Sequence, residues 1–298
     1  MTLDPALASV IGHRFAHVDG VRLHYVEAGP PAAPAVVMLH GFPESWYSWR
    51  RQIPPLVTAG YRVIAPDMRG VGDSERPRAR SAYALARLAD DAAGVMRAAG
   101  VERATVVGHD WGAAIAWQLA EREPRLVARL AVLNGPHPGQ FVRALRDPRQ
   151  AARSLYMLAF QLPWLPERVL GAGGCALLRR ALVRRGVPGA FTAADLDRYR
   201  AGWQRPGELT GALAPYRALA RRFRAARGPV RTPFAAPVLV IWGERDPYLG
   251  RALADPGAGA ARALRVERIA EAGHFVQADA AERVTALLLA FIRAEADR

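Results

Sequence analysis

The feature that most constrains the fold is the pentapeptide Gly108-His109-Asp110-Trp111-Gly112, which stands between an apolar run and an alanine-rich stretch. Residues 104–108 have the composition of a buried strand, and residues 113–121 are good helix formers. A strand that turns directly into a helix needs glycines beside the turn, because the backbone passes too close to itself for a Cβ. The pattern predicts that Asp110 is held above a sheet, at the N-terminal end of a helix. This is the position of a catalytic nucleophile.

Short apolar runs alternate with longer helical stretches through much of the chain, a pattern typical of a mostly parallel sheet covered by helices. Residues 21–28 alternate as an antiparallel strand does, after a turn at Asp19-Gly20. The other expected strands are residues 35–39, 61–65, 104–108, 130–133, 238–242 and 264–269, and the expected helices are 84–99, 113–121 and 280–294. The pattern predicts an α/β fold.

The alternation stops near Pro136–Pro138 and resumes near Pro237. The residues between are helix-like, rich in arginine and interrupted by proline and glycine, which indicates a helical cap over the carboxyl ends of the strands. We therefore expect a core in two parts, residues 1–137 and 234–298, with a cap at 138–233. The Gly-rich stretch 171–174 is interpreted as a joint, because no strand precedes it and no Lys-Ser/Thr follows it, as a phosphate loop requires.

The net charge of +14 is concentrated in one segment. The 41 basic residues are all arginine, and residues 141–231 hold 18 of them against 5 acidic residues. The rest of the chain is nearly neutral, with 23 arginines against 22 acidic residues. A solvated arginine-rich surface explains this best, and a patch for phosphates or an anionic surface is the alternative. Since no nucleic-acid-binding module accompanies the segment, we predict no nucleic-acid partner.

Several site classes are excluded by what the sequence lacks. No apolar run reaches the roughly 18–20 residues that span a bilayer, and the N-terminal residues do not resemble a signal peptide. Cys175 is the only cysteine, so an intramolecular disulfide and a cysteine zinc cluster are excluded. No pair of histidines has metal-ligand spacing with a third partner. We predict a cytoplasmic protein with no metal, no cofactor and no membrane partner.

Partners for Asp110 follow other predicted strands. Gly273-His274 comes after the strand at 264–269, where a histidine can act as a base. The acid that orients this base is expected after the strand at 238–242, and Asp246 is favoured over Glu244, which lies closer to the strand. The chain order is then nucleophile, acid, histidine.

An oxyanion hole is expected beside the nucleophile. His40-Gly41-Phe42-Pro43 follows the strand at 35–39, so the backbone N–H of Phe42 can act together with the N–H of Trp111. His109 is interpreted as a packed, hydrogen-bonded histidine that points away from Asp110.

Taken together, these motifs resemble the α/β-hydrolase fold. The resemblance runs from about residue 15 to 293 and includes Pro66-Asp67-x-Arg69-Gly70-x-Gly72-x-Ser74. It implies a mostly parallel eight-stranded sheet with an inserted helical cap. Aspartate as nucleophile narrows the resemblance to the branch of epoxide hydrolases and haloalkane dehalogenases. The resemblance to epoxide hydrolases implies a detoxification enzyme that opens epoxides to vicinal diols. It also implies that a covalent alkyl ester forms on Asp110 and that water activated by His274 and Asp246 hydrolyses this ester.

Two cap tyrosines hold the epoxide oxygen in epoxide hydrolases of this type. The stretches around Tyr156 and Tyr216 resemble the segments that carry them, although Pro215 stands where relatives often have asparagine or another residue. Tyr199 and Tyr248 are the nearest rivals and are interpreted as packing residues. The predicted pocket residues are aromatic: Trp46, Phe160, Trp164 and Phe275. The expected partners are a small epoxide and water, and the expected state is a monomer or a homodimer.

Two other functions fit parts of the pattern. A haloalkane dehalogenase would use Asp110 and His274 in the same way, with the Trp111 indole N–H holding the halide. Its second donor is often an asparagine at the position of Phe42, and Trp164 or Trp203 would have to replace it. The other alternative is a ligand-binding protein without turnover, although such proteins usually lose a member of the triad. An assay that detects chloride release, diol formation or neither would distinguish these three functions.

Overall fold

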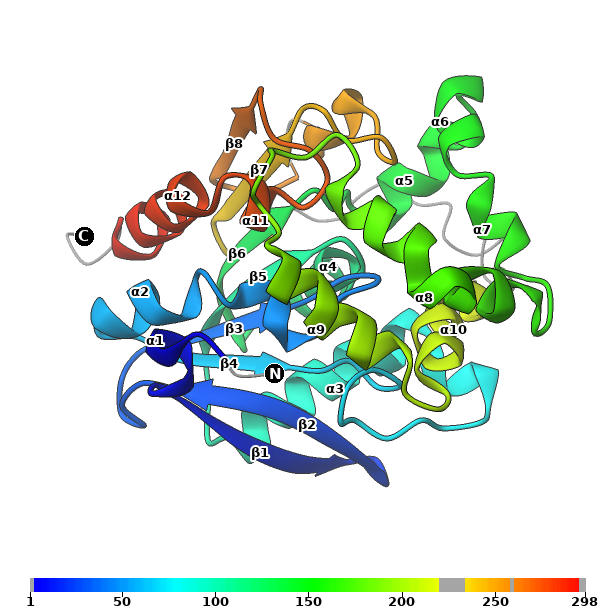
Figure 1. The fold of residues 1–298 in the computed structure, drawn as a ribbon. Helices are drawn as coiled ribbons and strands as arrows, with labels where there is room; N and C mark the ends of the chain where they lie inside the picture. The colour runs from blue at the N-terminus through cyan, green and yellow to red at the C-terminus, as the bar shows by residue number, and fades with distance from the viewer. Residues whose placement is uncertain (1–2, 220–233, 258–259, 295–298) are drawn as a thin grey trace.

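A computed structural model describes residues 3–219, 234–257 and 260–294, which build one eight-stranded sheet (Figure 1). The strands are β1 (Ile11–Val18), β2 (Val21–Ala28), β3 (Ala35–Leu39), β4 (Arg62–Pro66), β5 (Ala104–His109), β6 (Val127–Leu133), β7 (Val238–Gly243) and β8 (Leu264–Ile269). Their order is β1-β2-β4-β3-β5-β6-β7-β8. The β1–β2 and β2–β4 pairs are antiparallel, and the other pairs are parallel. The predicted mostly parallel sheet of eight strands is confirmed.

The central strands are buried on both faces, which explains their unbroken apolar sequences. In β3, Val36 and Met38 belong to the hydrophobic core on one face, and Val37 and Leu39 belong to the core on the other. The first core is covered by α2 (Ile53–Thr58) and α12 (Ala281–Arg293), and the second by α3 (Leu85–Ala98) and α4 (Trp111–Arg122). Burial on both faces fixes the register of the strands, and therefore the height at which each strand ends.

The covering helices begin and end where sequence chemistry dictates. In α12, the buried residues Val284, Leu288 and Phe291 recur every three or four positions, which gives one apolar stripe toward the sheet. Helix α3 is followed by Gly100 at φ 68°, a left-handed conformation that glycine adopts without strain. The short elements of this part of the chain are α1 (Pro5–Ala8), η1 (Trp46–Trp49), η2 (Arg80–Tyr83), η3 (Arg251–Ala254) and α11 (Val276–Asp279).

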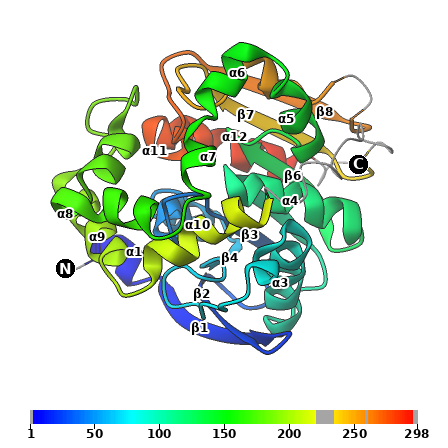
Figure 2. The same cartoon turned by 90° about the vertical axis from the view of Figure 1, so that its right-hand side faces the viewer.

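Six helices of the described residues lie between β6 and β7 and form what we call the helical insertion. They are α5 (Pro138–Ala144), α6 (Pro148–Arg153), α7 (Tyr156–Ala159), α8 (Leu165–Val183), α9 (Ala193–Trp203) and α10 (Glu208–Leu219). Figures 1 and 2 show them gathered on one side of the sheet, with α8, α9 and α10 side by side. Helix α5 begins at Pro138, the first residue of the predicted cap, and the extent of the cap stays a prediction. Its predicted end falls among residues 220–233, outside the described residues, so that boundary stays a prediction.

The Gly-rich stretch 171–174 lies inside α8, where it interrupts the helix. Ala172 has extended dihedral angles, and Gly173, Gly174 and Cys175 have φ values of 57°, 66° and 63°. The joint expected from the sequence is therefore a break between two helical segments. Cys175 is buried at this break as a free thiol.

Candidate active site

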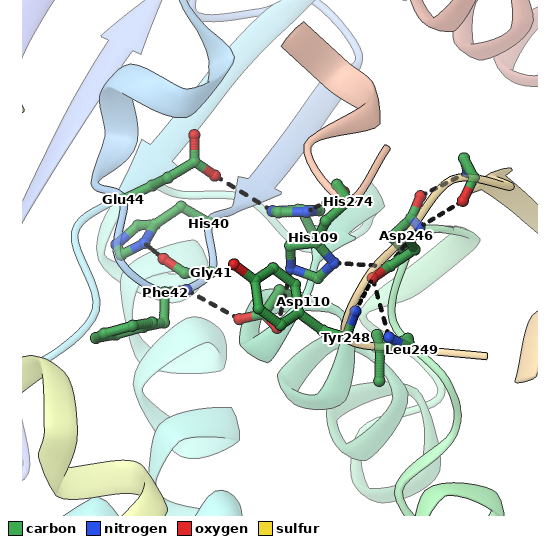
Figure 3. A network of polar contacts seen from close by, with 12 residues as sticks. His40, Gly41, Phe42, Glu44, His109, Asp110, Asp246, Tyr248, Leu249 and His274 are labelled. Atoms are coloured by element: carbon green, nitrogen blue, oxygen red, sulfur yellow. Dashed lines mark hydrogen bonds and ion pairs between the residues drawn. The ribbon is translucent and has the colours of Figure 1, made fainter. Parts of the chain in front are cut away.

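The predicted nucleophile stands on a sharp turn between β5 and α4. Asp110 has φ 53° and ψ −117°, outside the regions that residues with a Cβ usually occupy. A Cβ on Gly108 would lie 2.4 Å from the carbonyl oxygen of Gly112, and one on Gly112 would lie 2.0 Å from that of Leu39. Only glycine fits at these two positions. The turn therefore depends on both glycines, and it carries the Asp110 carboxylate to the end of the sheet (Figure 3).

His274 lies between two carboxylates. Its Nε2 is 3.5 Å from Asp110 Oδ2, and its Nδ1 is 2.7 Å from Asp246 Oδ2 (Figure 3). Glu244, the competing candidate, instead lies 3.5 Å from the guanidinium of Arg268. The geometry therefore brings Asp110, His274 and Asp246 together, in the arrangement that the predicted roles of nucleophile, base and orienting acid require.

Asp246 is held by a set of donors that the sequence analysis missed. Its Oδ1 accepts the N–H groups of Tyr248 (2.7 Å) and Leu249 (2.9 Å), and its Oδ2 accepts Asn134 Nδ2 (2.8 Å). Asn134 also bridges to β7, because Gly243 N donates to its Oδ1 at 2.8 Å. A polar residue directly after the apolar strand β6, at the same sheet edge as Asp246, is the sequence feature that could have indicated this role.

The charges of this cluster stabilise one another. Burial alone would lower the pKa of His274, but the charge of Asp246 and hydrogen bonds to Asp110 and Asp246 outweigh it and raise that pKa to about 10. Burial alone would raise the pKa of Asp110, but the hydrogen bond and charge of His274 hold it below its ordinary value. The resting site therefore contains an imidazolium between two carboxylates at neutral pH.

A backbone donor faces the nucleophile. Phe42 N–H donates to Asp110 Oδ1 at 2.9 Å (Figure 3). Gly41 permits this approach, because a Cβ there would lie 2.4 Å from the Cβ of Asp110. Trp111 is the first residue of α4, and its part in an oxyanion hole stays a prediction.

Two tyrosines from the insertion face Asp110 across the cavity. Tyr156 begins α7 and Tyr216 lies in α10, and their ring centroids are 6.2 Å apart. Burial raises the pKa of both phenols, and the negative charge of Asp110 raises it further, so both stay protonated. Among their rivals, Tyr199 donates to Glu44 at 2.9 Å instead. Tyr248 does line the cavity, where its ring packs against His274 with centroids 5.2 Å apart.

The cavity has two arms that meet at Asp110, Tyr156 and Tyr216. The larger arm, about 300 Å³, runs along Trp111, Phe141, Met157 and other mostly apolar residues. The smaller arm, about 190 Å³, is lined by Phe42, Phe160, Leu170, Leu177, Leu178, Tyr248, His274 and Phe275, among others. Two of the predicted pocket residues, Phe160 and Phe275, lie in this arm.

The other two predicted pocket residues lie elsewhere. Trp46 is buried beside His13 in a separate cavity of about 350 Å³, because its backbone N–H is bound to Asp67 Oδ1 at 2.9 Å. Trp164 stands in the loop before α8 at φ 52°, and 62% of it is exposed. The structure therefore corrects these two assignments: an aromatic residue in the right segment does not by itself indicate the direction of its side chain.

A second polar network lies under the one formed by Asp110, His274 and Asp246. The sequence analysis identified only part of it. His109 Nε2 donates to the carbonyl oxygen of His274 at 2.9 Å, and its Nδ1 lies 3.3 Å from Glu44 Oε2 (Figure 3). Glu44 is fully buried and accepts hydrogen bonds from Ser48, Tyr199 and Gln277. Burial alone would raise the pKa of Glu44, but the hydrogen bond and charge of His109 outweigh it and lower that pKa. His109 is a packed, hydrogen-bonded histidine, as predicted, and this network fixes the backbone of His274.

The model of the α/β hydrolase fold family matches residues 34–281. Epoxide hydrolase 4 of Homo sapiens is 33% identical over 303 residues, covering 98% of this chain and 81% of that protein. The chain belongs to the α/β-hydrolase-fold epoxide hydrolases. This family assignment confirms the resemblance seen in the motifs, and the enzyme class follows from it.

Other comparisons place the chain in the same family. The AB hydrolase superfamily protein YfhM of Bacillus subtilis (strain 168) is 38% identical over 282 residues, covering 94% of this chain and 97% of that protein. A crystal structure of Bacillus megaterium epoxide hydrolase, in complex with an inhibitor, superposes with a TM-score of 0.85 and 31% identity. It covers 94% of this chain and all of the other. The likeness therefore includes the helical insertion as well as the sheet.

Within the described ranges, no group of three or more His, Cys, Asp or Glu side chains is arranged to hold a metal ion. Within the same ranges, no helix is both long and apolar enough to cross a bilayer.

Proposed function

We propose that this enzyme opens epoxides to vicinal diols through a covalent ester on Asp110. The observation that carries the proposal is that Asp110, Tyr156 and Tyr216 line the same cavity from opposite sides. A carboxylate on one side can attack a carbon of the epoxide while two phenols on the other side hold its oxygen. His274 and Asp246 stand behind the nucleophile, where the second step needs them.

In the first step, an oxygen of the Asp110 carboxylate attacks one ring carbon, and the bond from that carbon to the epoxide oxygen breaks. The oxygen leaves as an alkoxide, which requires a proton donor. Tyr156 and Tyr216 are protonated because burial and the charge of Asp110 raise the pKa of each. A proton from the tyrosine pair yields the hydroxyl of the ester intermediate.

Formation of the ester also prepares His274 for the second step. Esterification removes the negative charge of Asp110, one of the groups that raise the pKa of His274. The imidazolium then loses its proton, which restores the proton taken from the tyrosine pair. Neutral His274 accepts a proton from water, and the resulting hydroxide attacks the Asp110 carbonyl carbon. The ester bond breaks, the departing alkoxide takes the remaining hydrogen of the attacking water, the diol leaves, and Asp110 carboxylate and His274 imidazolium are regenerated.

The N–H of Phe42 stabilises the oxyanion that forms during this hydrolysis, together with the N–H of Trp111. No cofactor takes part in either step. We infer that the substrates are apolar epoxides with a substituent on each ring carbon, because two mostly apolar arms extend from the reacting carboxylate.

The test is to trap the ester. The His274→Ala variant is mixed with trans-stilbene oxide, digested and analysed by mass spectrometry. We expect one substrate mass added to the peptide that contains Asp110, and no release of diol while that ester persists. The exposed histidine in β1 provides a matched control, because the His17→Ala variant should turn over as the wild type does.

Three results would contradict the proposal. One is an unmodified Asp110 peptide in the His274→Ala variant, and another is diol formation that survives in Asp110→Ala. The third is halide release from 1-chlorohexane without diol formation from any epoxide, which would indicate the dehalogenase alternative. The geometry disfavours that alternative, because the Trp111 ring packs edge-on against Tyr216 with centroids 5.0 Å apart, and a hydrogen bond to Trp111 moderates the pKa of that tyrosine.

A further inference from the structure

Exposed apolar side chains are concentrated in the helical insertion. Among the described residues, Phe15 is the one large exposed apolar side chain outside the insertion. The others are Leu155, Leu158, Leu162, Trp164, Leu165, Val169, Leu177 and Val183. Leu158 is 68% exposed and Trp164 is 62% exposed. Apolar side chains that cluster in this way on the surface of a protein indicate a binding partner.

Six of these side chains define what we call the α7–α8 face: Leu155, Leu158, Leu162, Trp164, Leu165 and Val169. They belong to α7 and the residue before it, the loop after it and the first turns of α8, which lie at the right-hand edge of the molecule in Figure 1. The guanidinium of Arg168 lies 5.2 Å from the centre of the Trp164 ring. Aromatic rings next to guanidinium groups are suited to a boundary between water and an apolar phase.

The segment of the chain that carries this face has a charge of one sign. Between Asp147 and Asp195 the sequence contains seven arginines and one acidic residue, Glu167. That carboxylate is bound to Arg217, with N–O distances of 2.7 and 3.0 Å. A symmetric contact with a second copy of the chain would bring arginines against arginines, which is unfavourable. The surface complements an anionic partner.

Helix α8, which carries part of the α7–α8 face, also lines the cavity at Asp110. Leu177 of α8 is 49% exposed, and it lines the smaller arm of the cavity together with Asp110. An apolar compound dissolved in a lipid layer would reach the nucleophile along α8. This observation favours a lipid surface over an acidic protein, because a protein partner gives no reason for an apolar path to the reacting groups.

We propose that the α7–α8 face binds peripherally to anionic phospholipid surfaces, with its leucines and Trp164 inserted at the level of the headgroups and the arginines of the insertion bound to lipid phosphates. The sequence prediction of no membrane partner rested on the absence of a spanning segment, and peripheral binding does not require one. Delivery of apolar epoxides from the lipid to Asp110 is a consequence that rests on the proposed function, whereas the binding itself does not.

The test is co-sedimentation of the full-length protein with phosphatidylcholine vesicles, with or without 30% phosphatidylglycerol. We expect binding to the anionic vesicles that weakens as salt increases, and weak binding to the neutral ones. The Leu158→Ser/Leu162→Ser variant should bind the anionic vesicles at least about tenfold more weakly, because it removes two apolar side chains that become buried in the lipid on binding. Phe15→Ser is the matched control, because it removes an exposed apolar side chain on β1 and should bind as the wild type does.

Fluorescence gives an independent measurement at the site. Trp164 is exposed, whereas the other six of the seven tryptophans are buried. Binding should therefore shift the emission to shorter wavelength and protect it from acrylamide, and Trp164→Phe should abolish both changes while sedimentation persists. The proposal is overturned if anionic vesicles do not bind, if the leucine variant binds them as the wild type does, or if polyglutamate binds the α7–α8 face and vesicles do not. Wild-type hydrolysis of a water-soluble epoxide by the leucine variant establishes that it is folded.

Discussion

The sheet and the helical insertion form opposite walls of one cavity, and they hold their active-site side chains in different ways. On the sheet side, Asp246 accepts four hydrogen bonds, and Asp110 is bound by a backbone N–H and faces His274. On the insertion side, Tyr156 and Tyr216 are surrounded by rings at centroid distances of 5.0–6.2 Å. Hydrogen bonds are directional, whereas ring contacts tolerate small displacements. In the proposed mechanism, the sheet therefore fixes the geometry of nucleophile and base, and the insertion supplies proton donors that can adjust to the substrate.

The largest effect should come from removing both proton donors of the insertion. The Tyr156→Phe/Tyr216→Phe variant should form the ester about 10²–10⁴-fold more slowly, because no phenol remains to protonate the alkoxide. Each single variant should lose less, since the other hydroxyl still reaches the oxygen. The measurement is single-turnover ester formation in the His274→Ala background. Tyr61→Phe is the control and should form the ester at the wild-type rate. If the double variant formed the ester at a near wild-type rate, the insertion would not supply the proton donors, and this distinction between the two walls would be wrong.

A smaller effect should follow from loosening the sheet side without touching the reacting groups. Asn134→Gly removes one donor to Asp246 and keeps a backbone that suits φ 37°. We expect ester hydrolysis to slow by about tenfold, as the loss of one hydrogen bond to a charged group predicts, while ester formation changes less. Asn134→Ala should slow hydrolysis in the same way and should also lower the Tm of the protein, because alanine is strained at this φ. Equal slowing of both steps would indicate general damage to the site instead of misplacement of His274.

The charge coupling within the sheet wall can be measured directly. Asp110 raises the pKa of His274, so Asp110→Asn, which resembles the neutral ester, should lower that pKa from about 10 by at least about one unit. An NMR titration of the His274 imidazole measures the change. Asp73→Asn removes an exposed carboxylate on another loop and should leave the pKa of His274 unchanged. An unchanged pKa in Asp110→Asn would mean that ester formation does not convert His274 into a base.

The smallest effect concerns the arginines of the insertion. If their field steers substrates, kcat/KM for an epoxide that carries a carboxylate should fall a few-fold between low salt and 0.1 M, where charges are screened beyond about 10 Å. A neutral epoxide of the same shape should not respond. Arg184 lies close enough to Tyr248 at the cavity to affect the pKa of that phenol, so Arg184→Gln should reduce the difference. Equal salt responses of the two substrates would identify the arginines as solvated surface only.

Most of the fold could be predicted because burial on both faces gives continuous apolar runs. The strands at 35–39 and 264–269 have the predicted bounds, and the strand expected at 61–65 is displaced by one residue. Among the strands whose bounds were predicted, the largest displacement is at β6, which begins at Val127 instead of residue 130, and β1 (Ile11–Val18) had no predicted bounds. Arg129 interrupts the apolar run, yet it is 8% exposed, with its guanidinium 5.5 Å from the centre of the Phe291 ring. Apolar patterning alone does not detect such a buried arginine.

The site was predictable where its residues belong to local motifs. Asp110 and His274 follow strands in recognisable pentapeptide and dipeptide contexts, and the choice of Asp246 over Glu244 agrees with the contact to His274. The roles of Asn134 and Glu44 depend on contacts with residues more than 60 positions away, which no local pattern reveals. The directions of the Trp46 and Trp164 side chains depend on the tertiary structure in the same way.

The unequal arms of the cavity have a consequence for the stereochemistry of the product. An epoxide with one bulky and one small substituent fits in one orientation, with the bulky group in the arm of about 300 Å³ and the small group in the arm of about 190 Å³. In the proposed mechanism, this orientation presents one ring carbon to Asp110, and displacement inverts the configuration at that carbon alone. For a given epoxide, the relative volumes of the two arms would then select the carbon that is attacked and with it the handedness of the diol, so we expect substitutions that narrow one arm, at Met157 or Phe160, to change that selection.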